Sequence, residues 1–98
     1  MKPFAERMRE EQRLVILRLL AELISYKANS STLTAAMDNL GHGISRDQVK
    51  THIRWLEEQA LLSTDEPIDG LLVATLTERG LEVATGRAIV PGVKRPGA

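Results

Sequence analysis

The first quarter of the chain carries hydrophobic residues at the spacing of an α-helix. Between Pro3 and about Tyr26 there is no glycine and no internal proline. Five apolar residues recur there every three or four positions: Leu14, Leu17, Leu20, Ala21 and Ile24. This spacing predicts one long helix. About 22 residues at roughly 1.5 Å each would span about 33 Å, so we expect the N-terminal end of this helix to project beyond the core.

Two shorter helical stripes follow the polar segment 28–31. The first stripe has apolar residues at positions 33, 36, 37 and 40, and either Ser30 or Ser31 can cap its helix. Gly41 is well suited to end that helix in the left-handed conformation. The second stripe begins at Ser45, which forms an S-x-x-Q capping box with Gln48. Its inward positions are expected to be Val49, Ile53, Leu56 and Ala60.

The pattern changes to short apolar segments after the third helix. Segments 61–64 and 71–76 are separated by Pro67 and by an Asp69-Gly70 pair, which predicts a β-hairpin. Thr77 is then placed to cap a fourth helix that runs to about residue 85. Residues 87–98 contain two prolines and two glycines, so we expect an extended tail that is ordered only where it docks.

The predicted order is helix, helix, turn, helix, hairpin, helix. This is the order of a winged helix-turn-helix domain. We therefore predict a mainly α fold with a small β-hairpin, in which residues 1–86 form a winged helix-turn-helix domain with a long N-terminal helix. Residues 87–98 form the C-terminal tail. A chain of 98 residues has room for one core.

Composition narrows the class of protein. The chain is 43% hydrophobic and 27% charged, which is typical of a globular domain. It has no cysteine, which excludes disulfides, thiol catalysis and Cys-rich zinc sites. The N-terminus is charged and the apolar runs are short, so we expect no signal peptide and no membrane segment. These features favour a cytoplasmic protein.

No motif in the chain indicates catalysis. The sequence lacks a Gly-rich phosphate loop, an H-E-x-x-H motif and a nucleophile elbow. His42 and His52 are ten residues apart and have no companions at metal-ligand spacing. We therefore predict no enzymatic activity, no cofactor, no metal site and no small-molecule ligand.

Two motifs resemble those of winged-helix repressors of the MarR and ArsR type. Residues 49–62, with the pattern V-x-x-x-I-x-x-L-E-x-x-x-L-L, resemble the recognition helix and the start of the following strand in these proteins. Residues 76–80, Leu-Thr-Glu-Arg-Gly, resemble the Leu-Thr-x-x-Gly that follows the wing. The resemblance covers roughly residues 30–86 and implies the same fold. The metal-sensing cysteines of ArsR sensors are missing, so it implies no metal response.

The C-terminal part of the sequence is similar to a narrower family. Residues 77–96 resemble the end of a family of small proteins from Mu-like phages and prophages. That resemblance implies a genomic setting and a fold, and it implies no established activity.

The outward face of the third helix is the candidate DNA-binding surface. In a helix-turn-helix module, the second helix places its N-terminal outward side chains against base edges, while neighbouring groups hold phosphates. The candidates on this face are Ser45, Arg46, Lys50, Thr51 and Arg54. The alternative is that these residues form only the solvated side of an amphipathic helix.

Charge opposes the DNA interpretation in part. The hairpin region 61–77 contains three acidic residues and no lysine or arginine, so phosphates should repel it. Basic excess remains only at the two ends. Residues 1–27 hold six Lys and Arg against four Glu, and residues 86–98 hold three basic residues and no acid.

A homodimer is expected, because winged-helix regulators usually dimerise and the two-fold axis sets the spacing of DNA half-sites. The candidate dimerisation residues are Ile16, Leu20, Leu23, Ile89 and Val90. The alternative is that the broad apolar face of the first helix is simply buried. The sequence thus predicts a DNA-binding protein of phage or prophage origin, with transcriptional regulation as one role open to it. A protein-interaction adaptor that keeps the fold without binding DNA is the competing hypothesis.

Overall fold

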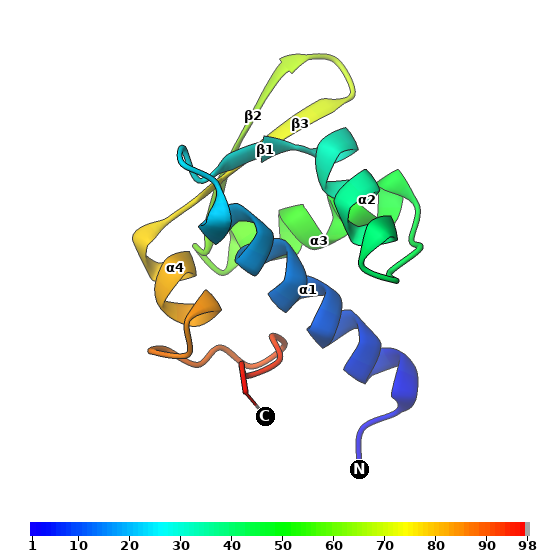
Figure 1. Cartoon of the computed structure of the whole chain (residues 1–98), viewed down its shortest axis with the longest axis vertical. Helices are drawn as coiled ribbons and strands as arrows, with labels where there is room; N and C mark the ends of the chain where they lie inside the picture. The colour runs from blue at the N-terminus through cyan, green and yellow to red at the C-terminus, as the bar shows by residue number, and fades with distance from the viewer. Residues whose placement is uncertain (98) are drawn as a thin grey trace.

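The computed structural model describes residues 1–97, which form four helices and a three-stranded antiparallel sheet (Figure 1). The elements, in chain order, are α1 (Phe4–Glu22), β1 (Lys27–Asn29), α2 (Ser30–Asn39), α3 (Arg46–Glu58), β2 (Leu62–Ile68), β3 (Leu71–Leu76) and α4 (Glu78–Ala84). The protein is therefore a small α+β fold. All four predicted helices and the predicted hairpin are confirmed.

Helix α1 supplies one side of the core. Its buried apolar residues are Leu14, Ile16, Leu17 and Leu20. The helix ends at Glu22, earlier than the predicted end near Tyr26. The helix ends because Leu23 already has an extended backbone, with φ −85° and ψ 142°, and Tyr26, with φ 55°, then turns the chain toward the sheet. The Tyr26 carbonyl then accepts a hydrogen bond of 2.8 Å from the backbone N–H of Leu76.

Strand β1 was not predicted from the sequence. It pairs with β3, with Ala28 opposite Ala74, and the strand order is β1-β3-β2. Its three residues, Lys-Ala-Asn, are too few and too polar to show an alternating pattern. Its last residue, Asn29, caps α2 by accepting a hydrogen bond of 2.8 Å from the Thr32 N–H. The prediction that a serine caps α2 is therefore wrong.

The turn and cap between α2 and α3 follow the prediction closely. Gly41 has a φ of 89°, as expected for a residue that ends a helix in the left-handed conformation. The Ser45 hydroxyl accepts from the Gln48 N–H at 3.1 Å, and the Gln48 side chain accepts from the Ser45 N–H at 2.9 Å. Both bonds of the capping box are thus present. The inward stripe is fully buried at Val49, Ile53 and Leu56.

Ala60 is the exception to that stripe. It lies beyond the end of α3, has a φ of 63° and is exposed. The helix has already ended two residues earlier, so a helical wheel no longer predicts where the Ala60 side chain points.

The hairpin is longer than predicted on its first strand. Strand β2 runs to Ile68, whereas the apolar pattern indicated an end near residue 64. The pairing register shifts between Asp65 and Ile68, around Pro67. Because β2 is an edge strand, a proline and an irregularity are tolerated there. Strand β3 is central, and its inward residues Leu72, Ala74 and Leu76 are buried.

The Leu-Thr-x-x-Gly segment joins the sheet to α4, and its Thr and Gly each have a structural role. Thr77 caps α4 by accepting from the Gly80 N–H at 3.0 Å, and its hydroxyl donates to the Ala60 carbonyl at 2.8 Å. A Cβ atom on Gly80 would overlap the Leu61 carbonyl oxygen and lie 2.7 Å from Leu76 Cδ1. Only glycine therefore allows α4 to approach the chain so closely where α3 leads into β2.

The predicted C-terminal tail docks on the chain itself. Its Val90 and Val93 are buried, and the backbone N–H of Lys94 donates to the Glu10 carbonyl at 3.1 Å. Gly92 has a φ of 98°, and a Cβ atom there would lie 2.6 Å from the Trp55 ring. The tail therefore returns beside the N-terminal half of α1, as Figure 1 shows.

Candidate functional site

The outward face of α3 presents the charged side chains predicted from the sequence. Arg46, Asp47, Thr51 and Arg54 are exposed, and Lys50 is half-buried. Residues of this face line one shallow depression: Asp47, Lys50, Thr51, Arg54, Trp55 and Glu58. Their spacing of three and four positions places them along one side of the helix. The structure therefore brings Lys50, Thr51 and Arg54 together, with Arg46 exposed in the first turn.

Two of the candidate residues use their hydroxyl groups within the helix. The Ser45 hydroxyl belongs to the capping box, and the Thr51 hydroxyl donates to the Asp47 carbonyl at 3.0 Å. Phosphate oxygens only accept hydrogen bonds. Thr51 would therefore have to give up its backbone partner before it could donate to a phosphate.

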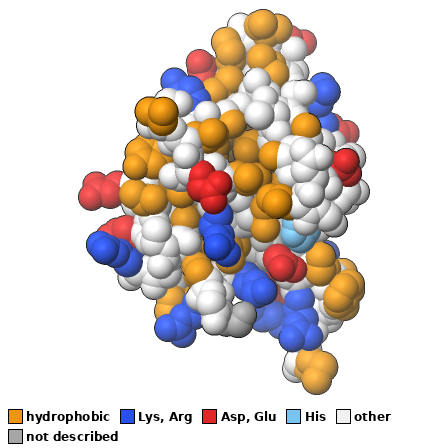
Figure 2. Space-filling model, viewed as in Figure 1, with side chains coloured by type: hydrophobic (Ala, Val, Ile, Leu, Met, Phe, Trp, Pro, Cys, Tyr) orange, Lys and Arg blue, Asp and Glu red, His pale blue; other side chains and the backbone are white. Residues whose placement is uncertain are grey.

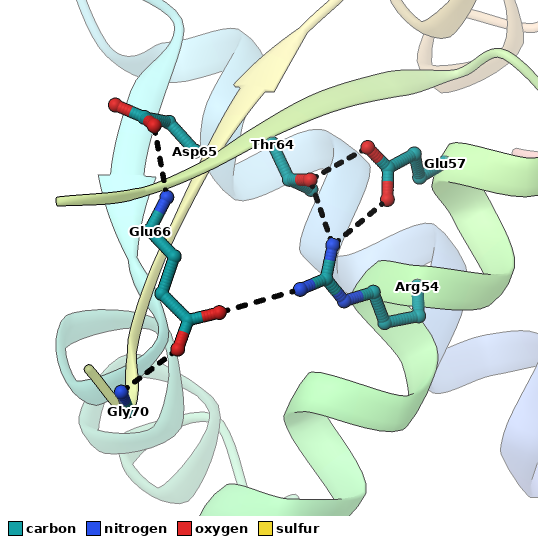
Figure 3. A network of polar contacts seen from close by, with 6 residues as sticks. All are labelled: Arg54, Glu57, Thr64, Asp65, Glu66 and Gly70. Carbon is teal, nitrogen blue, oxygen red and sulfur yellow. Dashed lines mark hydrogen bonds and ion pairs between the residues drawn. The ribbon is translucent and has the colours of Figure 1, made fainter. Parts of the chain in front are cut away.

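Arg54 is held by the hairpin, as Figure 3 shows. Its Nη1 donates to Glu57 Oε1 at 3.1 Å and to Thr64 Oγ1 at 3.0 Å, and its Nη2 lies 3.5 Å from Glu66 Oε1. Thr64 in turn donates to Glu57 Oε2 at 2.6 Å. That bond, together with Arg54, holds the pKa of the Glu57 carboxyl below its usual value.

The network ties the hairpin to α3 and compensates the charge of Arg54. The second carboxylate oxygen of Glu66 accepts from the Gly70 N–H at 2.9 Å, so the hairpin turn orients the acid that faces Arg54. Each ion pair is partly exposed, and pairs of this kind typically contribute no more than about 1 kcal/mol. Two carboxylates nevertheless neutralise this arginine as a binding group for an external anion.

Arg46 and Lys50 differ from Arg54 in this respect. Within residues 1–97, the four ion pairs involve Lys2 with Glu10, Arg54 with Glu57, Arg54 with Glu66, and Lys94 with Glu11. Neither Arg46 nor Lys50 takes part in any of them. These two cations are therefore the ones on the α3 face that can meet an external anion without breaking an ion pair.

Two cations of α1, Arg9 and Arg13, lie near α3. The Arg13 guanidinium lies 4.0 Å from the centre of the Trp55 ring and donates to the Gly92 carbonyl at 2.9 Å. His52 Nε2 is 2.9 Å from Gln12 Oε1. Burial, followed by the positive charges of Arg13 and Arg9, lowers the pKa of His52 to about 4. The contact with the Trp55 ring places Arg13 beside α3.

The electrostatic environment therefore differs on the two sides of α3. The hairpin side carries Asp65, Glu66 and Asp69 and no Lys or Arg, while the α1 side carries Arg9 and Arg13 together with Glu6 and Glu10. Figure 2 shows Lys and Arg side chains gathered at the end of the molecule where the N-terminal half of α1 and the C-terminal segment lie. The sequence showed basic excess at both termini but could not show that the fold brings part of it beside α3.

The five candidate dimerisation residues fall into two groups. Ile16, Leu20 and Val90 are buried in the core of the chain itself, so they offer no surface to a second subunit. Ile16 and Leu20 were predicted as an outer face because the helical pattern of α1 is apolar on more than one side, and Val90 was predicted because the tail was expected to be ordered only where it docks. Leu23 and Ile89 are exposed, at 40% and 62%.

The described residues also bear on two other features, a membrane-spanning helix and a metal site. None of the helices in residues 1–97 combines the length and the apolar character needed to cross a membrane. The same part of the chain contains no group of three or more His, Cys, Asp or Glu side chains placed to hold a metal ion.

The fold and this surface define a small α+β protein that presents a charged helix face. Comparison with known proteins gives its relatives. The chain is 52% identical over 87 residues to protein gp26 of Escherichia phage Mu, which covers 89% of the chain and 88% of the relative. It is 48% identical over 82 residues to a protein of Haemophilus influenzae, which covers 84% and 79%. The chain belongs to the family that contains Mu gp26.

This result confirms the resemblance to proteins of Mu-like phages. Both relatives are described as uncharacterized proteins. No family model matches the chain, and no solved structure matches it. One of the two relatives is thus a phage protein, and neither description names an activity.

Proposed function

We propose that this protein is a winged helix-turn-helix DNA-binding protein of phage or prophage origin, and that it is not an enzyme. The element order α1-β1-α2-α3-β2-β3-α4 and the strand order β1-β3-β2 support the fold assignment. Helices α2 and α3 are joined by a short turn, and the hairpin follows α3 directly, as in this class of domain. Transcriptional regulation is one role that such a protein could perform.

The observation that carries the proposal is that Arg46 and Lys50 are free of ion pairs within residues 1–97. Both lie in the N-terminal half of α3, on its outward face. In a helix-turn-helix module this is the part of the helix that meets base edges in the major groove. Arginine and lysine are also the side chains that most often contact guanine and phosphate.

Charge then sets the side from which DNA approaches. The acidic hairpin repels phosphates, while the N-terminal half of α1 is neutral, with three Arg and three Glu in residues 4–13, and does not repel them. The duplex should therefore run along α3 toward α1 and leave the hairpin outside the main contact. In this arrangement the hairpin positions α3 through its contacts with Arg54 and makes no contact with the DNA backbone.

Arg46→Ala and Lys50→Ala should each weaken binding to duplex DNA by roughly tenfold, equal to about 1.4 kcal/mol. Fluorescence anisotropy with a mixed-sequence duplex at about 50 mM salt, where nonspecific binding is strong, measures the change. Arg79→Ala is the matched control, because Arg79 is an exposed cation on α4. If all three variants weaken binding equally, net charge rather than the α3 face is responsible. If the wild-type protein does not bind at this salt concentration, the DNA proposal fails.

Glu66→Gln should strengthen DNA binding about threefold, because it removes a repelling carboxylate and frees Arg54 from one of its two acids. Asp69→Asn removes the same charge from the same hairpin turn, and Asp69 is in no ion pair within residues 1–97. The same anisotropy assay should therefore show a smaller gain for Asp69→Asn. Equal gains would mean that release of Arg54 contributes nothing.

The Arg54 network also favours a second candidate function. With Arg54 neutralised by Glu57 and Glu66, the hairpin presents an acidic surface beside a balanced helix face. An adaptor that docks on a basic surface of another protein would use these features directly. The anisotropy experiment separates the two functions. An adaptor of this kind should not bind duplex DNA through Arg46 and Lys50, so replacing these residues should not weaken any binding that is seen.

A further inference from the structure

The described part of the tail, residues 87–97, is seated on α3 by contacts at Trp55. Gly92 packs against the Trp55 ring so closely that a Cβ atom on it would lie 2.6 Å from Cζ2 and Cη2. The Arg13 guanidinium covers the same ring and donates to the Gly92 carbonyl at 2.9 Å. Trp55 in turn lines the depression on the α3 face together with Lys50. The tail therefore borders the face that is proposed to meet DNA.

The tail has a defined backbone path, fixed by contacts within the chain. A turn at residues 90–93 is closed by a hydrogen bond of 3.1 Å from the Val93 N–H to the Val90 carbonyl, and both valines are buried. The Lys94 N–H donates to the Glu10 carbonyl at 3.1 Å, which ties the tail to α1. A segment that is already ordered loses little conformational freedom when it binds a ligand. The backbone that carries the cations of the tail is therefore preorganised beside α3.

The tail carries positive charge that acidic side chains of its own do not compensate. Residues 86–98 contain Arg87, Lys94 and Arg95 and no Asp or Glu. Lys94 is paired with Glu11 at 3.7 Å. Arg87 and Arg95 are exposed and take part in no ion pair within residues 1–97. These two arginines can therefore meet an external anion without breaking an ion pair.

Arg87 and Arg95 stand at the place where the tail closes on itself. A Cβ atom on Gly86 would be in van der Waals contact with Pro96, at 3.8 Å from its Cγ. Arg87 follows Gly86 and Arg95 precedes Pro96, so the two arginines branch from the two ends of one closed loop. Figure 2 shows Lys and Arg side chains gathered at the end of the molecule where the C-terminal segment lies in Figure 1. The two arginines therefore contribute to one local concentration of positive charge.

We propose that Arg87 and Arg95 hold the phosphate backbone of the bound duplex, a role that the acidic hairpin cannot perform. This inference rests on the proposed DNA binding by α3. The major groove is about 12 Å wide, so a helix inserted in it has a phosphate strand on each side. Arg54, which contacts the hairpin, and Trp55, which contacts the tail, are consecutive and point about 100° apart around α3. The hairpin and the tail thus border different sides of α3, and of these two elements the tail is the one that carries cations.

Proximity to α3 is the reason to choose the DNA backbone as the anion. Trp55 comes five residues after Lys50, which is about 7.5 Å along the helix axis. A duplex that contacts Lys50 therefore passes close to the tail that is seated on Trp55. The guanidinium group can bind two phosphate oxygens with two parallel N–H donors, so arginine suits this contact.

Loss of the two arginines should weaken duplex binding and reduce its salt dependence. Arg87→Ala with Arg95→Ala should raise the Kd of the full chain for a mixed-sequence duplex at least about tenfold at about 50 mM salt, measured by fluorescence anisotropy. Because two phosphate contacts are lost, the slope of log K against log salt should fall in magnitude by about one to two.

Arg18→Ala with Arg79→Ala is the matched control for charge. These two arginines are exposed on α1 and α4 and take part in no ion pair within residues 1–97. Their loss lowers the net charge by the same amount and should change the salt slope by less than about half a unit. Circular dichroism and thermal melts establish that each variant is folded at the assay temperature.

Gly92→Ala tests the seat of the tail without changing any charge. The added Cβ atom would overlap the Trp55 ring, and a φ of 98° is strained for alanine. Trp55 is the only tryptophan of the chain, so displacement of the tail should shift the fluorescence emission to longer wavelength. DNA binding should weaken as well. In this background, removing Arg87 and Arg95 should raise the Kd by less than about threefold, because the cations are no longer held beside α3.

The outcomes separate this proposal from DNA binding itself. If the Arg87 and Arg95 double variant and its control weaken binding equally, net charge is responsible, and the role of the tail is overturned while binding through α3 stands. A full tenfold loss in the Gly92→Ala background would show that the seat on Trp55 does not place the cations, which also overturns the proposal. A wild-type protein that does not bind DNA overturns both proposals. If Gly92→Ala does not fold, the two double variants still decide.

Discussion

Gly80→Ala should destabilise the protein by at least about 3 kcal/mol, even though alanine favours a helix over glycine by about 1 kcal/mol. The added Cβ atom would overlap the carbonyl oxygen of Leu61, which is fully buried and accepts a hydrogen bond from the Thr77 N–H. A shift of this carbonyl away from residue 80 would strain its hydrogen bond from the Thr77 N–H. Thermal melts should show a fall in Tm of more than about 10 °C, or no cooperative folding at all.

Arg79→Ala is the control for this substitution. Arg79 is the neighbouring residue in α4 and is exposed, so its replacement should change stability by no more than about 0.5 kcal/mol. A Gly80→Ala protein that is as stable as the wild type would contradict the close approach of α4 to the start of β2.

Acidification should destabilise the protein through His52. The imidazole is buried, and its pKa falls from 6.5 in the unfolded chain to about 4 in the fold. Below the unfolded value the unfolded chain binds a proton that the folded chain does not, so stability is lost as the pH falls from 6.5 toward 4. The free energy of unfolding should decrease by about 2 kcal/mol between about pH 7.5 and about pH 5 on this account.

Urea denaturation at several pH values measures this loss. His52→Gln removes the titrating group and should reduce the pH dependence by about 2 kcal/mol over the same interval, whereas His42→Gln should retain it. Carboxylates such as Glu57 also titrate at low pH, so the comparison of variants is more informative than the wild-type curve. If His52→Gln leaves the pH dependence unchanged, the buried neutral imidazole is not its source.

The parts of the fold that the sequence predicted are those set by local interactions. The capping box at Ser45 and the stripe through Leu56 depend on residues within one helix, and both are confirmed. Strand β1 depends on pairing with β3, some 45 residues later in the chain, and three residues carry no pattern of their own. The end of α1 is linked to the same pairing, because the chain leaves the helix at an extended Leu23 and Tyr26 then turns it toward β3.

The candidate site divides in a similar way. The sequence placed Arg46 and Lys50 on the outward face of α3, because helical periodicity determines that face. It could not show that Arg54 is held by Glu66, since that contact depends on how the long edge strand β2 folds past α3. It also could not place Arg13 on the Trp55 ring, because this contact requires α1, α3 and the tail at Gly92 to meet.

The salt dependence of binding to duplex DNA tests the central claim most directly. Binding through cations releases counterions, so the logarithm of the binding constant should fall linearly with the logarithm of the salt concentration. Replacing Arg46 and Lys50 together with alanine should reduce the magnitude of that slope by about one to two and weaken binding, since each lost phosphate contact removes about one unit. A wild-type protein that does not bind at about 50 mM salt, or a double variant with an unchanged slope, would contradict the assignment of α3 as the DNA-binding helix.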